Sequence, residues 1–529
     1  MEPLDRPVFS RRAVVGGALA TGVSYVSRNL LNAQSHMPAS ANQEFSHTTD
    51  GARADASLFY RPVNAWVGDT IPFYQDGVYH IFYLRDWRDP EHRGRGSTWY
   101  KVTTRDFVHF EDAGEMIPKG TTQEQDMSVA TGSVLHAQGR YHAFYTGYNS
   151  IRAKQGHPEQ GICHAVSADS LHWTKVPADT FFPDPALYGM DAWRDPFVFW
   201  NEQAGEYWML CAARLSTGPH RRRGCTALCT SRDLREWKIL PPLYAPSLFE
   251  DHECPDLFQI GEWWYLIFSE FSDQTVTRYR MAHSPSGPWI TPTVDTFDGR
   301  AFYAAKTAGN EYGRFLFGWI PTRHGNRDDA FWDWGGNLGI HEIVQAPEGT
   351  LSIRLPFTIR QAMATPFPFS WGQRVGDVAV TNGEADLQAS ERFAVVSLGE
   401  LPSKCRIDAL LSVSARTRRC GLTLHGDPTL DSGYSLRFDL TRDRVVVELY
   451  PRPDGNSPYL SGLERPFHLQ ASGALRVSIL VDGDIAVAYI DDKLALTSRM
   501  PRFANNILST FVEDGTMRVN QVEISLFSE

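Results

Sequence analysis

The chain has 529 residues, of which 42% are hydrophobic and 21% are charged. This length favours two or more domains, and the composition indicates a folded protein with a substantial core rather than a disordered one. Its 51 basic and 62 acidic residues give a formal net charge of −11, which argues against nucleic acid or an anionic membrane as the main partner. No apolar run is long enough to span a bilayer.

The first forty residues contain the three parts of an export signal. A basic pair, Arg11-Arg12, is followed by a short apolar stretch at 13–20 and by Ala39-Ser40-Ala41, a small-x-small cleavage signature. The arginine pair resembles the twin-arginine type of signal. We therefore predict an export signal over residues 1–41 and a linker over 42–57. The mature protein is expected to be periplasmic or extracellular, without a membrane anchor.

A turn followed by an aromatic strand recurs along the first two thirds of the chain, and a Ser/Thr-x-Asp turn recurs between the copies. The copies are 52–66 residues apart, and their turn glycines are Gly77, Gly139, Gly205, Gly261 and, more weakly, Gly313. One such sheet cannot bury both of its faces, whereas a closed ring lets each sheet cover its neighbour. Five copies predict a five-bladed β-propeller over residues 58–355. The alternative is a chance set of hairpins, which the doubled period disfavours.

The pattern changes after about residue 355. A proline-rich passage is followed by strands that alternate with a period of two, for example at 406–411, 445–450 and 475–481. Such alternation with regular turns is typical of a β-sandwich, which we predict over residues 356–529. No segment shows a long amphipathic helical stripe. The fold class is therefore expected to be all-β, with little helix.

The seven cysteines form neither a dense disulfide framework nor a zinc cluster. The pair Cys225 and Cys229 has no second pair at zinc-ligand spacing, so we expect no metal site. Cys405 and Cys420 could bridge neighbouring strands, and the sequence leaves this open. Because the number of cysteines is odd, at least one thiol is free.

Three acidic residues occupy the same phase of three repeats. Asp69, Asp195 and Glu253 precede the turn glycines of their repeats by eight to ten residues and have aromatic or apolar neighbours. Equal phase predicts that all three lie on innermost strands, facing the propeller axis. A single acidic residue is usually a solvated surface group. A buried cluster is costly without partners, so it indicates either a bound cation such as calcium or the cleavage of a glycosidic bond.

The sequences around these three residues resemble the signatures of glycoside hydrolase family 32, the invertase, levanase and inulinase group. The signatures are Asp69 in its Trp-x-x-Asp setting, Arg194-Asp195-Pro196 and Glu253-Cys254-Pro255-Asp256. Weaker similarities extend the resemblance over roughly residues 58–525, and they lie at Thr131–Ser133, Phe302–Thr307, Phe317–Trp319, Trp334–Leu338, Val481–Gly483 and Ala495–Arg499.

The resemblance implies a retaining mechanism on a furanoside, normally a β-fructofuranoside such as sucrose, levan or inulin, without a cofactor. Asp69 would be the nucleophile that forms a covalent glycosyl-enzyme, and Glu253 would be the acid/base, with the two carboxyl groups about 5–5.5 Å apart. Asp195 would stabilise the oxocarbenium-like transition state. Arg194 would keep Asp195 ionised and contact the substrate. The charge of Asp69 and an apolar wall at Cys254 would raise the pKa of Glu253.

Further residues are candidates for contact with an oligo- or polysaccharide substrate. Trp66 and Trp319 could stack on sugar rings or belong to the propeller core. Thr131 could offer its hydroxyl to the substrate or satisfy a strand edge, and Cys254 would line the pocket. His252 could tune the neighbouring acid, although most isolated histidines do not catalyse.

The chain departs from the family pattern at two positions that recognise fructose. The family has an asparagine directly before its nucleophile, where this chain has Gly68. It has a glutamine after the first repeat strand, where this chain has Leu84. The chain therefore resembles a divergent member of the family. The glycone or the linkage of its substrate could differ from those of other members.

Several functions are consistent with these residues. The leading hypothesis is an exported hydrolase of a β-fructofuranoside. A transglycosylase, or a hydrolase of another furanoside such as an arabinofuranoside, would use the same groups. A non-catalytic carbohydrate-binding propeller predicts a scrambled carboxylate trio, which the sequence contradicts. A calcium-stabilised scaffold predicts unfolding on chelation.

Overall fold

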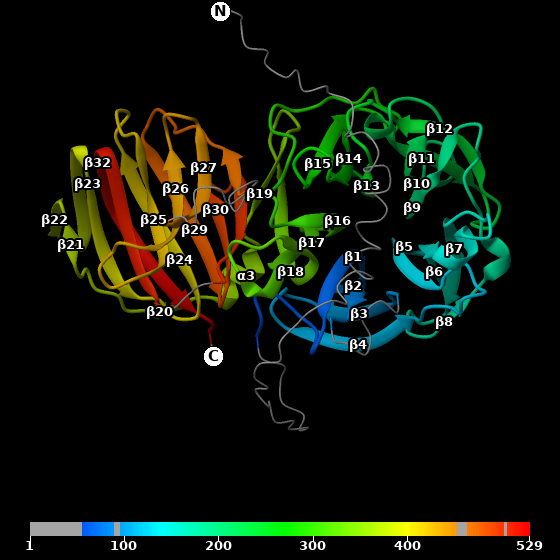
Figure 1. Ribbon diagram of the computed structural model, residues 1–529, viewed down its shortest axis with the longest axis horizontal. Helices are drawn as coiled ribbons and strands as arrows, with labels where there is room; N and C mark the ends of the chain where they lie inside the picture. The colour runs from blue at the N-terminus through cyan, green and yellow to red at the C-terminus, as the bar shows by residue number, and fades with distance from the viewer. Residues whose placement is uncertain (1–55, 89–95, 452–462, 502–504, 529) are drawn as a thin grey trace, which may run out of the picture.

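The computed structural model describes residues 56–88, 96–451, 463–501 and 505–528. They form two bodies built of β-strands that lie side by side (Figure 1). The predicted export signal at 1–41 lies outside these residues, as does most of the predicted linker. In the described part of the chain, no helix is long and apolar enough to cross a membrane.

The first body is a ring of five antiparallel sheets, which are the blades of a propeller. Blade 1 contains β1 (Trp66–Gln75), β2 (Val78–Asp86), β3 (Trp99–Thr104) and β4 (Phe110–Ile117). Blade 2 contains β5 (Ser128–Ala137), β6 (Arg140–Tyr148), β7 (Gln160–Ser167) and β8 (Trp173–Lys175). Blade 3 contains β9 (Tyr188–Asn201), β10 (Glu206–Leu215), β11 (Gly224–Ser231) and β12 (Lys238–Tyr244). Blade 4 contains β13 (Glu253–Ile260), β14 (Trp263–Glu270) and β15 (Val276–Ala282), and blade 5 contains β16 (Tyr303–Asn310), β17 (Gly313–Arg323), β18 (Trp332–Gln345) and β19 (Leu351–Arg354).

The ring closes between the first and the last blade. Strand β1 pairs with β18 at Val67 and Gly336, so blades 1 and 5 belong to one eight-stranded sheet. The first strands of the blades, β1, β5, β9, β13 and β16, surround the centre of this body in Figure 1. The predicted five-bladed propeller is confirmed.

The two repeated turns form as the sequence predicts, except that Gly313, the weaker fifth copy of the glycine turn, does not have a positive φ. Gly77, Gly139, Gly205 and Gly261 have φ angles of 79°, 77°, 65° and 59°, in the left-handed region that glycine adopts at little cost. In each Ser/Thr-x-Asp turn the aspartate accepts hydrogen bonds from two backbone N–H groups, over 2.8–3.1 Å. Such aspartate turns are a local property of the sequence, which is why the repeat is readable before folding.

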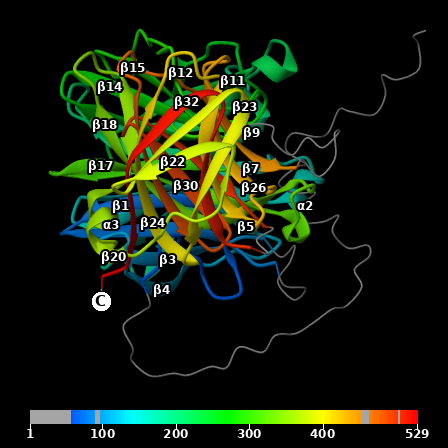
Figure 2. The same ribbon diagram turned by 90° about the vertical axis from the view of Figure 1, so that its left-hand side faces the viewer.

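The second body is a β-sandwich. Its strands are β20 (Thr365–Phe367), β21 (Arg374–Val375), β22 (Asp377–Thr381), β23 (Glu384–Glu400), β24 (Lys404–Val413), β25 (Arg419–Gly426), β26 (Gly433–Asp439), β27 (Arg444–Tyr450), β28 (Glu464–Pro466), β29 (Ala474–Asp482), β30 (Ile485–Ile490), β31 (Leu494–Arg499) and β32 (Ile507–Leu526). The long strand β32, red in Figure 2, pairs with β20, β23, β24 and β25. The predicted sandwich is therefore confirmed.

Helices are short in the described residues, as expected from the sequence. The α-helices are α2 (Ser150–Ala153) and α3 (Phe357–Ala362), and the 3₁₀ helices are η1 (Pro177–Asp179), η2 (His220–Arg222) and η3 (His324–Asn326).

The two candidate cysteines for a disulfide, Cys405 in β24 and Cys420 in β25, are both buried and free. The remaining five cysteines are free as well, so this chain has no disulfide and the question that the sequence left open is answered.

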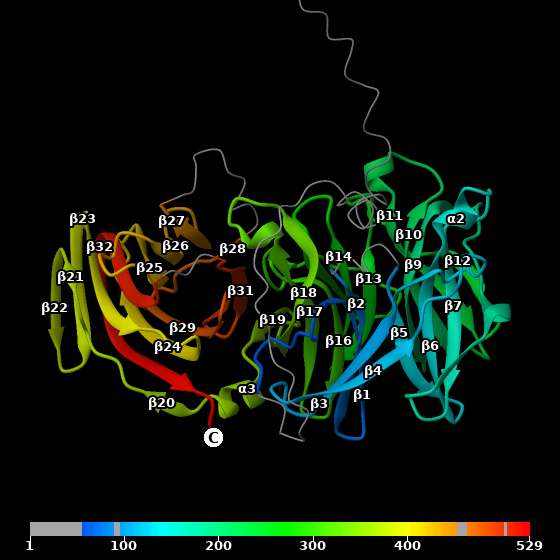
Figure 3. The same cartoon turned by 60° about the horizontal axis from the view of Figure 1, so that its bottom comes forward.

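The propeller and the sandwich share an apolar core. Leu480 and Ile485 of the sandwich belong to the same buried cluster as Ile343 and Ile353 of the propeller. Arg499 of β31 donates hydrogen bonds to two backbone carbonyl groups of β17. Strands β19 and β31 lie at this boundary (Figure 3). The sandwich therefore stabilises the fifth blade.

Candidate active site

The innermost strand of every blade is interrupted at the same phase. Each pairs irregularly with its neighbour, and the interruptions lie at Val67–Thr70, Val129–Gly132, Arg194–Phe197, Glu253–Asp256 and Tyr303–Lys306. A bulge re-aims side chains that regular pairing would hold in the sheet. Three bulge residues, Asp195, Cys254 and Ala304, have φ angles of 57°, 49° and 52°. The five bulges bring the predicted site residues to one place.

Asp69 accepts hydrogen bonds through both of its carboxyl oxygens. The hydroxyl of Thr131 donates to Oδ2 over 2.5 Å, and the indole Nε1 of Trp319 donates to Oδ1 over 2.9 Å. The Sγ atom of Cys254 lies 3.8 Å from Oδ2. These contacts come from blades 2, 5 and 4, so three other blades hold the carboxylate of blade 1 in one orientation.

Asp195 and Glu253 meet at Arg194. Arg194 Nη2 lies 2.9 Å from Glu253 Oε1, and Arg194 Nε lies 3.8 Å from Asp195 Oδ2. The backbone N–H of Cys254 donates to Asp195 Oδ2 over 3.0 Å. Because Cys254 also contacts Asp69, this residue connects all three predicted catalytic carboxylates. The expected separation of about 5–5.5 Å between Asp69 and Glu253 stays a prediction.

Glu253 is also bound by a residue that the sequence analysis missed. The hydroxyl of Tyr303 donates to Glu253 Oε2 over 2.6 Å. Tyr303 lies at the start of the fifth bulge, at the same phase as the predicted carboxylates, so the repeat contained the signal that could have identified it. The side chain of Glu253 keeps 17% of its surface exposed, which leaves it reachable from solvent.

Burial raises the pKa of both catalytic candidates. The pKa of Asp69 rises to about 6 because of burial and repulsion from Asp195, and the hydrogen bonds from Thr131 and Trp319 oppose the rise. Burial raises the pKa of Glu253 to about 7; Arg194 opposes this, while other carboxylates add to it.

The source of the repulsion on Glu253 differs from the prediction. The carboxylates that raise its pKa are Asp251 and Asp195, whereas the sequence suggested Asp69. Asp251 lies only two residues before Glu253, but the sequence does not reveal that its side chain is buried beside Arg194.

The remaining candidates are placed as follows. Thr131 donates its hydroxyl to Asp69 rather than to a free strand edge. Trp319 is 5% exposed and likewise serves Asp69. The ring of Trp66 is covered by the guanidinium groups of Arg61 and Arg88, each 4.6 Å from the ring centroid, so its contact with sugar stays a prediction.

His252 does not contact the acid that it neighbours in sequence. It is fully buried and stacks on Phe268, with 4.2 Å between ring centroids. Burial and the charge of Arg280 lower its pKa to about 3, so it is a neutral core residue at physiological pH.

One of the two departures from the family pattern, Gly68, adjoins Trp334. A Cβ atom on Gly68 would lie 2.1 Å from Cη2 of Trp334, so only glycine leaves room for this ring. Leu84 is buried in the apolar cluster against which Trp334 packs. Trp334 also lies 6.0 Å from Trp319, measured between ring centroids. The ring of Trp334 thus occupies the space that a side chain at position 68 would need.

The pKa values predict a narrow pH dependence. As the predicted nucleophile, Asp69 would have to be ionised to attack, so kcat/KM should fall as the pH drops below about 6. As the predicted acid, Glu253 would have to be protonated, so kcat/KM should also fall above about pH 7. Initial rates at low substrate concentration across this range should trace a bell with its maximum between the two values. A profile that is flat throughout would contradict these roles.

The propeller part of the chain matches a known protein family. The profile of the "Glycosyl hydrolases family 32 N-terminal domain" matches residues 60–349. A levanbiose-producing levanase from Bacillus subtilis is 26% identical over 313 residues, which cover 53% of this chain and 54% of the levanase. This chain therefore spans about half the length of that relative.

Solved structures show the same fold. A sucrose-6-phosphate hydrolase from Lactobacillus gasseri superposes with a TM-score of 0.69 at 17% identity, over 90% of this chain and 94% of that one. Fructan 1-exohydrolase IIa from Cichorium intybus, in complex with 1-kestose, superposes with a TM-score of 0.66 at 17% identity, over 89% and 97% of the two chains. At these identities the similarity concerns the fold alone.

Proposed function

Since this chain belongs to glycoside hydrolase family 32, we propose that it hydrolyses a β-fructofuranoside with retention of configuration. The observation that carries the proposal is the shared contact at Cys254, which joins Asp69, Asp195 and the backbone of Glu253 in one buried cluster. Double displacement at a sugar requires two carboxyl groups beside the same bond. Asp69 and Glu253 supply two such groups, and they have different hydrogen-bond partners.

In the first step, a carboxylate oxygen of Asp69 attacks the anomeric carbon while Glu253 gives its proton to the departing glycosidic oxygen. Thr131 and Trp319 hold the attacking carboxylate, so little reorientation is needed. The products of this step are a glycosyl-enzyme ester at Asp69 and the leaving group, which is released with a free hydroxyl.

In the second step, the Glu253 carboxylate removes a proton from water, and the oxygen of that water displaces Asp69 from the anomeric carbon. Arg194 and Tyr303 stabilise Glu253 while it is charged, since both donate to its carboxylate. Asp195 faces the same cluster and would stabilise the positive charge that develops on the sugar ring.

The test is a screen of the purified protein against sucrose, levan, inulin and arabinofuranosides, with the first-formed product anomer identified by NMR. We expect release of β-fructofuranose before mutarotation. Release of the inverted anomer, or binding of these sugars without hydrolysis, would count against the proposal. Product analysis with added acceptor sugar separates hydrolysis from transfer.

Trp334 gives a reason to expect a modified glycone pocket. Its ring fills the space that a side chain at position 68 would need, and Leu84 is an apolar residue of the cluster against which Trp334 packs. We therefore propose that the sugar is held there by fewer hydrogen bonds and more apolar contact than the family pattern provides.

Gly68→Ala tests this arrangement. The added Cβ must displace Trp334, which packs against Trp319, the donor to Asp69. We expect a fall in kcat/KM of roughly 10²-fold, because a misplaced nucleophile costs about that much. The matched control is Gly313→Ala, whose Cβ would meet its nearest atoms at 3.8–3.9 Å and should leave kcat/KM unchanged. Equal effects of the two variants would refute the role of Trp334.

A further inference from the structure

A single guanidinium nitrogen faces two carboxylates beside the active site. Arg194 Nη2 lies 2.9 Å from Glu253 Oε1 and 3.3 Å from Asp251 Oδ1. The side chain of Asp251 has no exposed surface, and that of Arg194 is 13% exposed. Since Arg194 cannot be deprotonated in this pH range, its charge is divided between the two acids.

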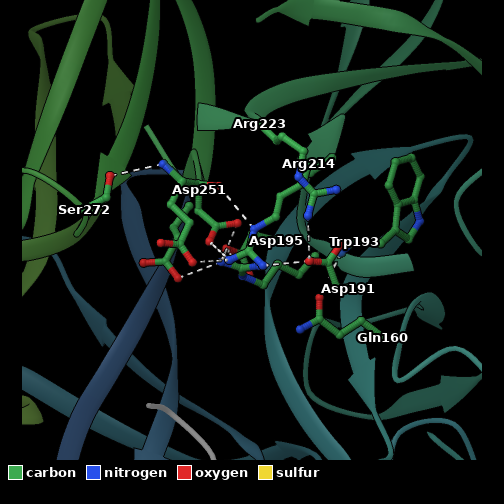
Figure 4. A network of polar contacts seen from close by, with 12 residues as sticks. Gln160, Asp191, Trp193, Asp195, Arg214, Arg223, Asp251 and Ser272 are labelled. Carbon is green, nitrogen blue, oxygen red and sulfur yellow. Dashed lines mark hydrogen bonds and ion pairs between the residues drawn. The ribbon is translucent and has the colours of Figure 1, made fainter. Parts of the chain in front are cut away.

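Asp251 is held in place independently of Glu253. Its Oδ2 atom forms a short ion pair with Arg214 Nη2, and Arg214 also contacts Glu250 Oε1 at 3.2 Å and Asp191 Oδ2 at 2.9 Å. Figure 4 shows Arg214 between Asp251 and Asp191. The backbone N–H of Glu250 donates to Ser272 over 3.1 Å. Asp251 is thus fixed by blade 3 and by the segment before blade 4.

Two buried atoms of this group form no hydrogen bond among the described residues. They are Arg194 Nη1 and Asp251 Oδ1, and Asp251 Oδ1 is held only through its 3.3 Å ion pair with Arg194 Nη2. Buried charged atoms without hydrogen bonds are costly. Stabilisation of the fold alone therefore explains this arrangement poorly.

We propose that Asp251 is a positioning residue that acts on Glu253 through Arg194. By retaining part of the Arg194 guanidinium, Asp251 lets Glu253 keep its proton until the glycosidic bond breaks. This inference deepens the proposed function and rests on it, because it assumes that Glu253 is the acid.

The charges around Glu253 agree with the sharing of Arg194 between Asp251 and Glu253. Burial lowers the pKa of Arg194, but Asp251, Glu253 and Asp195, in that order, raise it above its ordinary value. Titratable groups from several elements face the network. They are Asp69 of β1, Asp191, Arg194 and Asp195 of β9, Arg214 of β10, His220 of η2, Arg223 directly after η2, Glu250 before β13, Glu253 of β13 and Tyr303 of β16.

The same arrangement serves both chemical steps. Before cleavage, the Asp251 carboxylate balances Arg194, so a neutral Glu253 does not leave the cation unpaired. After Glu253 has given up its proton, Arg194 Nη2 is already 2.9 Å from its Oε1 and stabilises the new carboxylate.

The test is Asp251→Asn in the full chain, with Asp295→Asn as the matched control. Asp295 is a partly buried carboxylate that pairs with two buried arginines, Arg278 and Arg280, in blade 4. We expect Asp251→Asn to move the basic limb of the kcat/KM profile down by about one pH unit or more, a loss of about tenfold on that limb. Asp295→Asn should leave the basic limb in place. Asp251→Glu, which keeps the charge, should leave that limb close to its wild-type position.

A second readout does not depend on activity. The carboxyl group of Glu253 can be titrated by ¹³C NMR in protein labelled at glutamate, with Glu253→Gln identifying its signal. The midpoint should fall by about one pH unit in Asp251→Asn. If that variant does not fold, Asp251→Ser, which leaves room for water, replaces it. The inference is overturned if the Glu253 midpoint is unchanged in Asp251→Asn (or in Asp251→Ser, where that variant replaces it). It is also overturned if Asp295→Asn shifts the midpoint equally.

The two proposals fail in different ways. If the wild-type protein hydrolyses no furanoside, the proposed function is wrong, and the NMR titration still decides whether Asp251 controls Glu253. If hydrolysis occurs and the titration does not respond to Asp251→Asn, only the inference about Asp251 is wrong.

Discussion

Asp69→Asn is expected to lower kcat by at least about 10³-fold on any β-fructofuranoside that the wild-type protein hydrolyses. The substitution keeps the shape of the side chain but removes the charge that attacks the anomeric carbon. No neighbouring acid can take over the attack, because Asp195 and Glu253 are held by Arg194 in other orientations.

The same substitution should not weaken the fold. Burial and Asp195 raise the pKa of Asp69 to about 6, so the ionised carboxylate destabilises the folded state above that pH. The sign follows from the raised value: the unfolded chain ionises more readily than the folded one. At pH 8 the free energy of unfolding of Asp69→Asn, measured with denaturant, should equal or exceed that of the wild type. Ordinary turnover in a folded Asp69→Asn protein would contradict the assignment of the nucleophile.

Glu253→Gln is the second change with a large expected effect. Turnover of natural substrates should fall by at least about 10³-fold, because their leaving groups need a proton. An aryl furanoside has a leaving group that departs without one, so glycosyl transfer to Asp69 should remain fast. The glycosyl-enzyme would then accumulate, because activation of water also needs Glu253.

Stopped-flow measurement of the released phenol should show a burst of about one equivalent followed by slow turnover. Azide, which needs no general base, should restore the steady state. The Asp69→Asn variant provides the contrast. It should show no burst, and azide should not restore the retaining reaction. A Glu253→Gln protein that is equally slow with both kinds of leaving group would exclude Glu253 as the acid.

Much of the fold could be predicted because its signals are local. The turns at Gly77 and Gly139 and the aspartate turn at Asp106 are each specified by a few neighbouring residues, and they recur with the period of a blade. The phase of Asp69 and Glu253 within that period placed both on innermost strands. The five bulges could not be read in this way, because a bulge is a property of the pairing between two strands.

The sequence by itself therefore determined the ring of blades, the sandwich and the identity of the three carboxylates, since repeated turns and alternating strands need only local interactions. The tertiary structure decided how these carboxylates are held. Arg214 is far from Asp251 in sequence, and Trp334 is farther still from Gly68, yet each pair is in contact. Such contacts depend on which side chains face each other once the ring has closed, and no local pattern specifies that.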